Sequence, residues 1–166
     1  EVEYFKTIDA LIFHKKSVET TSILAFDFKD SQEAPRITRF LSSNHLSRVG
    51  FSGDGFVIGR SLADKLGVSV GDELTFLVPK VARHLHDAIS MRLSVEAILS
   101  TGTQIDEFLV ILSMNELTKH VPEEAIKSGY HIYIKDIFDA SRIARELEKT
   151  LNPSAVFINT WFDTHG

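Results

Sequence analysis

The sequence predicts an α+β fold, and three observations support this prediction. The first stretch, Val2 to Phe28, is rich in β-branched and aromatic residues, a composition typical of strands. Leu74 to Val78 alternates apolar and polar side chains, which is the period of a half-buried strand. After Asp139, apolar residues recur at helical spacing on one face: Ala140, Ile143, Ala144, Leu147 and Leu151. Helices concentrated in one part of such a chain are expected to cover one face of a sheet.

Composition limits the classes of function. The chain has 166 residues, 43% of them apolar, which suffices for one substantial core. Its 18 basic and 23 acidic residues give a net charge of -5, which argues against a nucleic-acid partner, since such a partner would need a basic stripe. Without cysteine, it has neither disulfides nor thiolate metal sites. Its apolar runs are too short to span a bilayer, and a start without Met or leader indicates a fragment of a longer protein.

Turn and cap signals place the elements of the first half. The polar patch His14 to Ser17 divides the first stretch into two strands. Pro35 begins a short predicted helix that ends near Ser43. A glycine-rich turn then precedes a short strand at Phe56 to Ile58.

The middle of the chain predicts a helix followed by two paired strands. Ser61 to Leu66 has helical spacing, and Gly67 stands where a left-handed C-terminal cap is expected. Leu74 to Val78 is expected to pair with Arg92 to Leu99. The connection between them, Pro79 to Met91, has thirteen residues, whereas hairpin loops usually have about two to five.

The last third alternates strands and helices. Glu107 to Leu112 reads as a buried strand. Ser113 and Glu116 form a capping box for a helix that ends at His120. Pro122 ends this helix and is expected at the first helical position (N1) of another turn, which runs up to Gly129.

Two more strands and one helix complete the chain. We expect strands at Tyr130 to Ile134 and Ala155 to Ile158, with the helix after Asp139 between them, ended by Asn152.

Catalytic and metal-binding motifs are weak. His84 and His86 would face the same side of an extended strand, as metal ligands must. Asp87 cannot join them by simple alternation, so we interpret the pair as solvated loop histidines. The sequence has neither a phosphate-binding glycine pattern nor a G-x-S-x-G elbow. We therefore expect no catalysis, no metal and no cofactor, with a small hydrolase that uses the histidines as the alternative.

One long segment resembles a known family. Gly55 to Pro79 reads G-x-x-I-G-R-S-L-A-x-x-L-G-V-x-V-G-D-x-L-T-x-L-V-P, which closely resembles the extracytoplasmic domain of LolC/LolE-type lipoprotein-releasing ABC transporter permeases, within the MacB/FtsX-like superfamily. The turn Thr101 to Asp106 and the tail Phe157 to Gly166, of the W-x-x-x-x-G type, are also similar to this family.

The resemblance implies a two-lobed periplasmic core domain at the periplasmic face of the bacterial inner membrane. Residues 1–54 and 106–166 would form a porter-like α/β sandwich lobe, and residues 55–105 a strand-rich sabre-like lobe. The full-length permease would release lipoproteins from the membrane and pass them to a soluble periplasmic carrier. Its partners would be a cytoplasmic ABC ATPase subunit, which binds the ATP, and a second permease subunit.

In the LolC branch, the connection between the two middle strands forms a hook that docks the carrier, and Pro79 to Met91 occupies that place. The residues implied in docking are Pro79, Lys80, Val81, Arg83, His84, Leu85, His86 and Arg92. Their basic character would favour an acidic rim on the carrier. Other readings are a short helix with Val81, Leu85 and Ile89 buried, a non-docking LolE-like domain, a MacB-like efflux permease, or an FtsX-like regulator of cell-wall hydrolases.

Overall fold

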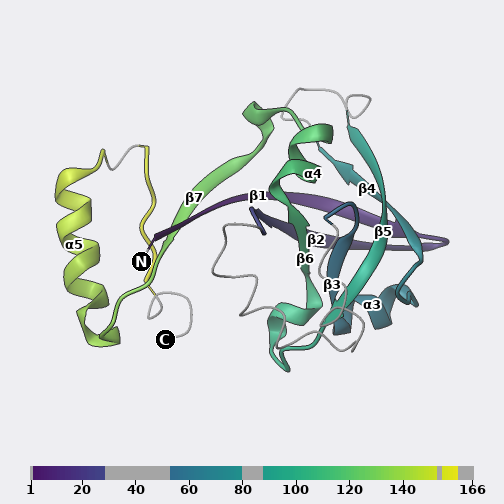
Figure 1. Cartoon of the computed structure of the whole chain (residues 1–166), viewed down its shortest axis with the longest axis horizontal. Coiled ribbons are helices and arrows are strands. Elements are labelled where there is room, and N and C mark those ends of the chain that lie inside the picture. Colours follow the sequence, from purple (N-terminus) through teal and green to yellow (C-terminus); the bar gives the residue numbers. More distant parts are fainter. Residues whose placement is uncertain (1, 29–52, 80–87, 153–154, 161–166) are drawn as a thin grey trace. The chain divides into compact units, whose positions relative to one another are not determined.

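The computed structural model describes residues 2–28, 53–79, 88–152 and 155–160 (Figure 1). The helix predicted between Pro35 and Ser43 lies outside them. The chain divides into two compact units, a larger one of Glu3–Tyr130 and a smaller one of the chain ends, Glu1–Val2 and His131–Gly166. The porter-like and sabre-like lobes remain a prediction.

The described strands form one seven-stranded sheet in the order β2-β6-β3-β5-β4-β1-β7. An additional pairing between β2 and β1 closes six of them into a ring, so the larger unit is built around a small barrel. The sheet draws strands from all three predicted segments, 1–54, 55–105 and 106–166. The strands are β1 (Val2–His14), β2 (Ser17–Phe26), β3 (Phe56–Gly59), β4 (Glu73–Val78), β5 (Ile89–Leu99), β6 (Leu109–Ser113) and β7 (Lys127–Ile132).

The predicted break in the first stretch is confirmed as a hairpin turn. β1 and β2 pair antiparallel up to His14 and Ser17, with two residues between them. Lys15 at this turn has a φ of 54°, which L-residues other than Asn and Asp rarely adopt. The His14 ring nitrogen Nδ1 lies 3.0 Å from the carbonyl oxygen of Leu66. If Nδ1 carries the proton, it donates to the end of the following helix and ties the hairpin to it.

The helix α3 (Arg60–Leu66) and its cap are also confirmed. Gly67 adopts the left-handed conformation, with φ 64° and ψ 43°. The N–H of Val68 donates to the Ala63 carbonyl oxygen at 3.0 Å, as in a Schellman motif. One face of α3 packs against the core, with Leu62, Ala63 and Leu66 buried.

A second turn beside α3 explains part of the family-like pattern. The buried Asp106 carboxylate accepts bonds of 2.8–3.1 Å from the N–H groups of Thr101 and Gly102 and from the Thr101 hydroxyl. The backbone of Asp106 lies directly against Gly59, and a Cβ on Gly55 would lie 2.7 Å from the Ser94 carbonyl oxygen. Both glycines therefore stand where another backbone approaches closely.

The apolar residues form two clusters on opposite faces of the sheet. The larger cluster fills the interior and includes an edge-to-face contact between Phe56 and Phe76, with ring centroids 4.9 Å apart. The smaller cluster uses the alternate residues of β2, β3, β5 and β6: Phe26, Val57, Ala97, Leu99 and Ile111. Strands buried on both faces are expected to read as continuous apolar runs, which matches β3 and β6.

Elements after β5 follow the prediction with shifted boundaries. Gln104–Glu107 is a 3₁₀ turn, η2, so β6 begins at Leu109 and not at Glu107. Pro122 was predicted at the first helical position, but it is the N-cap residue of the 3₁₀ turn η3 (Glu123–Ala125). The strand β7 begins at Lys127, three residues before the predicted start at Tyr130.

The capping box gives the predicted helix α4 (Met114–His120). The Ser113 hydroxyl accepts a hydrogen bond from the Glu116 N–H at 3.1 Å. The Glu116 carboxylate instead contacts Lys119 Nζ at 2.8 Å and His120 Nε2 at 3.0 Å. Burial raises the pKa of Glu116, but hydrogen bonds and charges from Lys119 and His120 outweigh burial, so its pKa lies below the ordinary 4.5.

This lowered pKa predicts a pH dependence of stability. Ionised Glu116 stabilises the fold above its unfolded-state pKa, and this contribution disappears as the pH falls through the lower folded-state pKa. Between about pH 6 and pH 3, we expect the free energy of unfolding to fall more for the wild type than for Glu116→Gln. Urea denaturation of both proteins at several pH values measures the difference, and parallel pH curves would contradict it.

In the smaller unit, η4 (Ile137–Asp139) leads into α5 (Ala140–Thr150), which confirms the predicted helix. Its apolar residues Ile143, Ala144 and Leu147 are only half-buried. The strand predicted at Ala155 to Ile158 is wrong, because these residues have no regular structure. Residue type alone favours a strand there, but a strand requires a hydrogen-bonded neighbour.

Candidate functional site at the base of the β4–β5 connection

The register of β4 and β5 defines where the predicted docking connection begins and ends. The two strands pair antiparallel from Glu73 opposite Ser94 to Val78 opposite Ile89. The connection therefore has ten residues, 79–88, and not thirteen. The prediction that it extends to Met91 is wrong, because Ile89 to Met91 belong to β5 and the Met91 side chain is buried.

The structure describes two of the eight predicted docking residues. Pro79 is exposed directly after β4. Arg92 lies on β5, opposite Thr75, with 71% of its side chain exposed. The alternative of a buried helix is wrong for its last member, Ile89, which is a strand residue. The other predicted docking residues lie outside the described residues: Lys80, Val81, Arg83, His84, Leu85 and His86.

Alternation separates the two faces of β4 and β5. Leu74, Phe76 and Val78 are buried in the barrel, whereas Glu73 and Arg92 are exposed on the outward face. There Arg92 Nε lies 3.3 Å from Glu73 Oε1. The sequence gives no direct signal for this ion pair, because the cross-strand register brings the two residues together.

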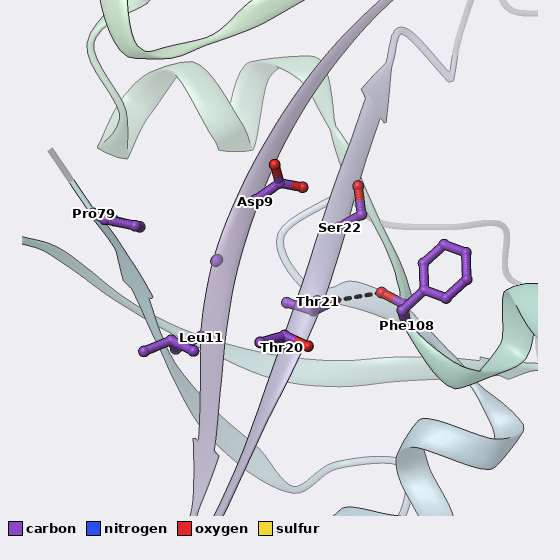
Figure 2. Close-up of a pocket in the computed structure, with 8 residues that line it drawn as sticks. Asp9, Leu11, Thr20, Thr21, Ser22, Pro79 and Phe108 are labelled. Carbon is purple, nitrogen blue, oxygen red and sulfur yellow. Dashed lines mark hydrogen bonds between the residues drawn. The ribbon is translucent and has the colours of Figure 1, made fainter. Parts of the chain in front are cut away.

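A groove of about 390 Å³ adjoins the base of the connection (Figure 2). Pro79 lies on one side of it and Phe108 on the other, and the β1–β2 hairpin forms its floor. The Thr21 hydroxyl donates to the Phe108 carbonyl oxygen at 2.7 Å. The lining is mainly apolar and hydroxyl-bearing: Asp9, Ala10, Leu11, Thr20, Thr21, Ser22, Pro79 and Phe108.

Chemically, the groove offers contact surface and hydrogen bonds. Among the described residues that line the groove, Asp9 is the one ionisable residue, and its carboxylate lies 3.9 Å from Lys127 Nζ. The part of the lining that the structure describes contains no histidine to act as a base for its serine and threonine hydroxyls. Sequence reasoning missed this groove because its residues come from distant parts of the chain.

The described part of the chain contains neither a cluster of metal-ligand residues nor a membrane-spanning helix. No group of three or more His, Asp or Glu side chains there has the arrangement of a metal site. The His84 and His86 pair lies outside this part. None of the described helices has the length and apolar character needed to cross a bilayer.

Comparison with known proteins gives a distant similarity. No family model matches the chain. It is 24% identical over 144 residues to the lipoprotein-releasing system transmembrane protein LolC of Buchnera aphidicola subsp. Schizaphis graminum (strain Sg). The match covers 83% of this chain and 35% of that protein, so the chain spans about a third of its relative's length. The chain is thus distantly similar to a transmembrane component of a lipoprotein-releasing system.

Proposed function

We propose that this chain is the periplasmic domain of an ABC transporter permease that releases lipoproteins from the inner membrane. In this proposal, the β4–β5 connection docks a soluble periplasmic lipoprotein carrier. The domain itself catalyses no reaction, and a separate cytoplasmic ATPase subunit supplies the energy. The lipoprotein substrate and a second permease subunit are its further partners.

The observation that carries the proposal is the β4–β5 connection. It leaves and re-enters the barrel at one cross-strand pair, Val78 and Ile89, yet it has ten residues. A tight hairpin needs only about two. Surplus length at a rigid strand pair is typical of loops that contact a partner. The distant similarity to LolC supports the assignment to a lipoprotein-releasing permease.

Charge supports an acidic partner for this connection. Its sequence contains Lys80, Arg83 and Asp87, and Arg92 lies on the adjoining outward face. The connection is thus locally basic in a chain whose net charge is -5. Electrostatic attraction of this kind raises the rate of association with an acidic surface and weakens as salt is added.

Replacement of residues 80–87 by a short Gly-Ser linker tests the proposal. The replacement leaves the pairing of Val78 with Ile89 in place. We expect binding to the lipoprotein carrier of the same organism to be lost, while the thermal midpoint changes by less than about 2 °C. Calorimetric titration and thermal denaturation measure the two effects.

Lys16→Ser is the matched control. It removes one positive charge from the exposed β1–β2 turn, and residues 80–87 also carry one net positive charge with His neutral. We expect this variant to bind the carrier like the wild type. A fall of several degrees in the midpoint of the linker variant would favour a packed segment over a docking loop. No binding by the intact domain at low salt would contradict the carrier-docking function.

A further inference from the structure

We infer that Glu73 is a specificity-determining residue, which limits how tightly the outward face of β4 and β5 binds acidic partners. It does so by pairing with Arg92 on the same face. The choice of the lipoprotein carrier as the natural partner rests on the proposed function. The effect of Glu73 on acidic ligands does not depend on that choice.

The geometry brings the two charges together. Thr75 stands opposite Arg92, and Ser94 stands opposite Glu73. Glu73 and Arg92 are therefore diagonal neighbours on one face, and the contact joins Arg92 Nε to Glu73 Oε1. Their side chains are 57% and 71% exposed, so a partner that covers this face meets both charges.

Glu73 and Arg92 are the main charged groups among the described outward-facing residues around them on β4 and β5. Thr75, Ser90 and Ser94 are uncharged. Glu96 is the next charged residue along β5, four positions from Arg92, which is about 13 Å along a strand. It is half-buried, close to Gly55. In the described part of this face, the charge of Glu73 therefore directly offsets that of Arg92.

Two opposite effects of Glu73 have to be weighed. A carboxylate beside Arg92 repels an incoming carboxylate and competes for the guanidinium. It also orients the guanidinium, which would favour binding. Exposed ion pairs hold side chains weakly, and the contact here is a single one at 3.3 Å. Repulsion and competition therefore exceed the benefit of orientation.

A hexaglutamate peptide is the first probe. At low salt, we expect Glu73→Gln to bind it about threefold more tightly than the wild type, the effect of one unit charge at close range in water. NMR titration follows the backbone amides of Ser90 to Ser94. The gain should disappear in the Glu73→Gln, Arg92→Gln double variant and shrink as salt is added.

Glu107→Gln is the matched control, because Glu107 is another exposed carboxylate, paired with Lys65 at 3.1 Å. It changes the net charge equally but lies elsewhere in the fold. Unchanged or weaker peptide binding by Glu73→Gln would overturn the inference, as would an equal gain in Glu107→Gln. Weaker binding would assign Glu73 the orienting role instead.

The lipoprotein carrier is the second probe and separates the two proposals. We expect Glu73→Gln to bind it more tightly, through a faster association rate. If neither the wild type nor Glu73→Gln binds the carrier, the proposed function fails, and the peptide result alone decides the inference. If the carrier binds both proteins equally, Glu73 does not determine specificity and the inference is wrong.

Discussion

Gly59→Ala is expected to lower the free energy of unfolding by about 3 kcal/mol or more, at or above the upper end for overpacked sites. Gly59 has ordinary extended angles, φ -62° and ψ 143°, so the cost is steric and not conformational. The new methyl group would meet the carbonyl oxygen, Cα and carbonyl carbon of Asp106. These are backbone atoms of a turn that the bonds from Thr101 and Gly102 hold in place. Denaturant unfolding measures the loss.

Gly67→Ala provides the contrast for this prediction. A Cβ at Gly67 would meet no atom of the described residues within 4 Å, but the φ of 64° at this position is strained for alanine. We expect this change to cost about 1 kcal/mol, the usual penalty of the left-handed conformation. A smaller loss for Gly59→Ala than for Gly67→Ala would mean that the turn at Asp106 moves aside easily.

Leu66→Ala is expected to cost about 2–5 kcal/mol, the range for large-to-small changes in a core. Leu66 is 4% exposed and belongs to the interior cluster. It is also the last residue of α3, where the left-handed cap at Gly67 and the contact with His14 fix the backbone. Because the backbone is fixed, the cavity collapses only partly. The measurement is again the free energy of unfolding.

Lys65→Ala is the control on the same helix. Lys65 is half-exposed and pairs with Glu107 at 3.1 Å, and exposed ion pairs contribute little. We expect a change of less than about 0.5 kcal/mol. A loss that small for Leu66→Ala would mean that α3 is not packed against the core at this position.

The docking role of the predicted site residues stays a prediction, but the structure gives the positions of two of them. The resemblance indicated Pro79, which directly follows β4, and Arg92, which lies on β5 opposite Thr75. The resemblance did not indicate Glu73 or the groove floor around Thr20, because neither belongs to a recognisable sequence motif. The connection was predicted to extend to Met91, which is too far along the chain. The apolar residues there fit one face of a helix as well as a strand. Pairing with β4 decides between these possibilities, and a single segment does not reveal its partner.

The sequence by itself determined the features that arise within a few residues. The polar patch after His14 makes a turn, Gly67 ends α3 because glycine accepts a positive φ, and Ser113 caps α4 with its hydroxyl. Each depends on local hydrogen bonds or backbone angles, so each can be read without knowing the rest of the chain.

Only the tertiary structure decided the closure of the sheet. β2 pairs in parallel with β6, and β3 with β5, although long stretches of sequence separate them. These pairings set the approach of Asp106 to Gly59, whereas the antiparallel register of β4 and β5 brings Glu73 beside Arg92. Strand pairing joins residues that are distant in sequence, so its energy depends on the whole arrangement and not on the local residue pattern.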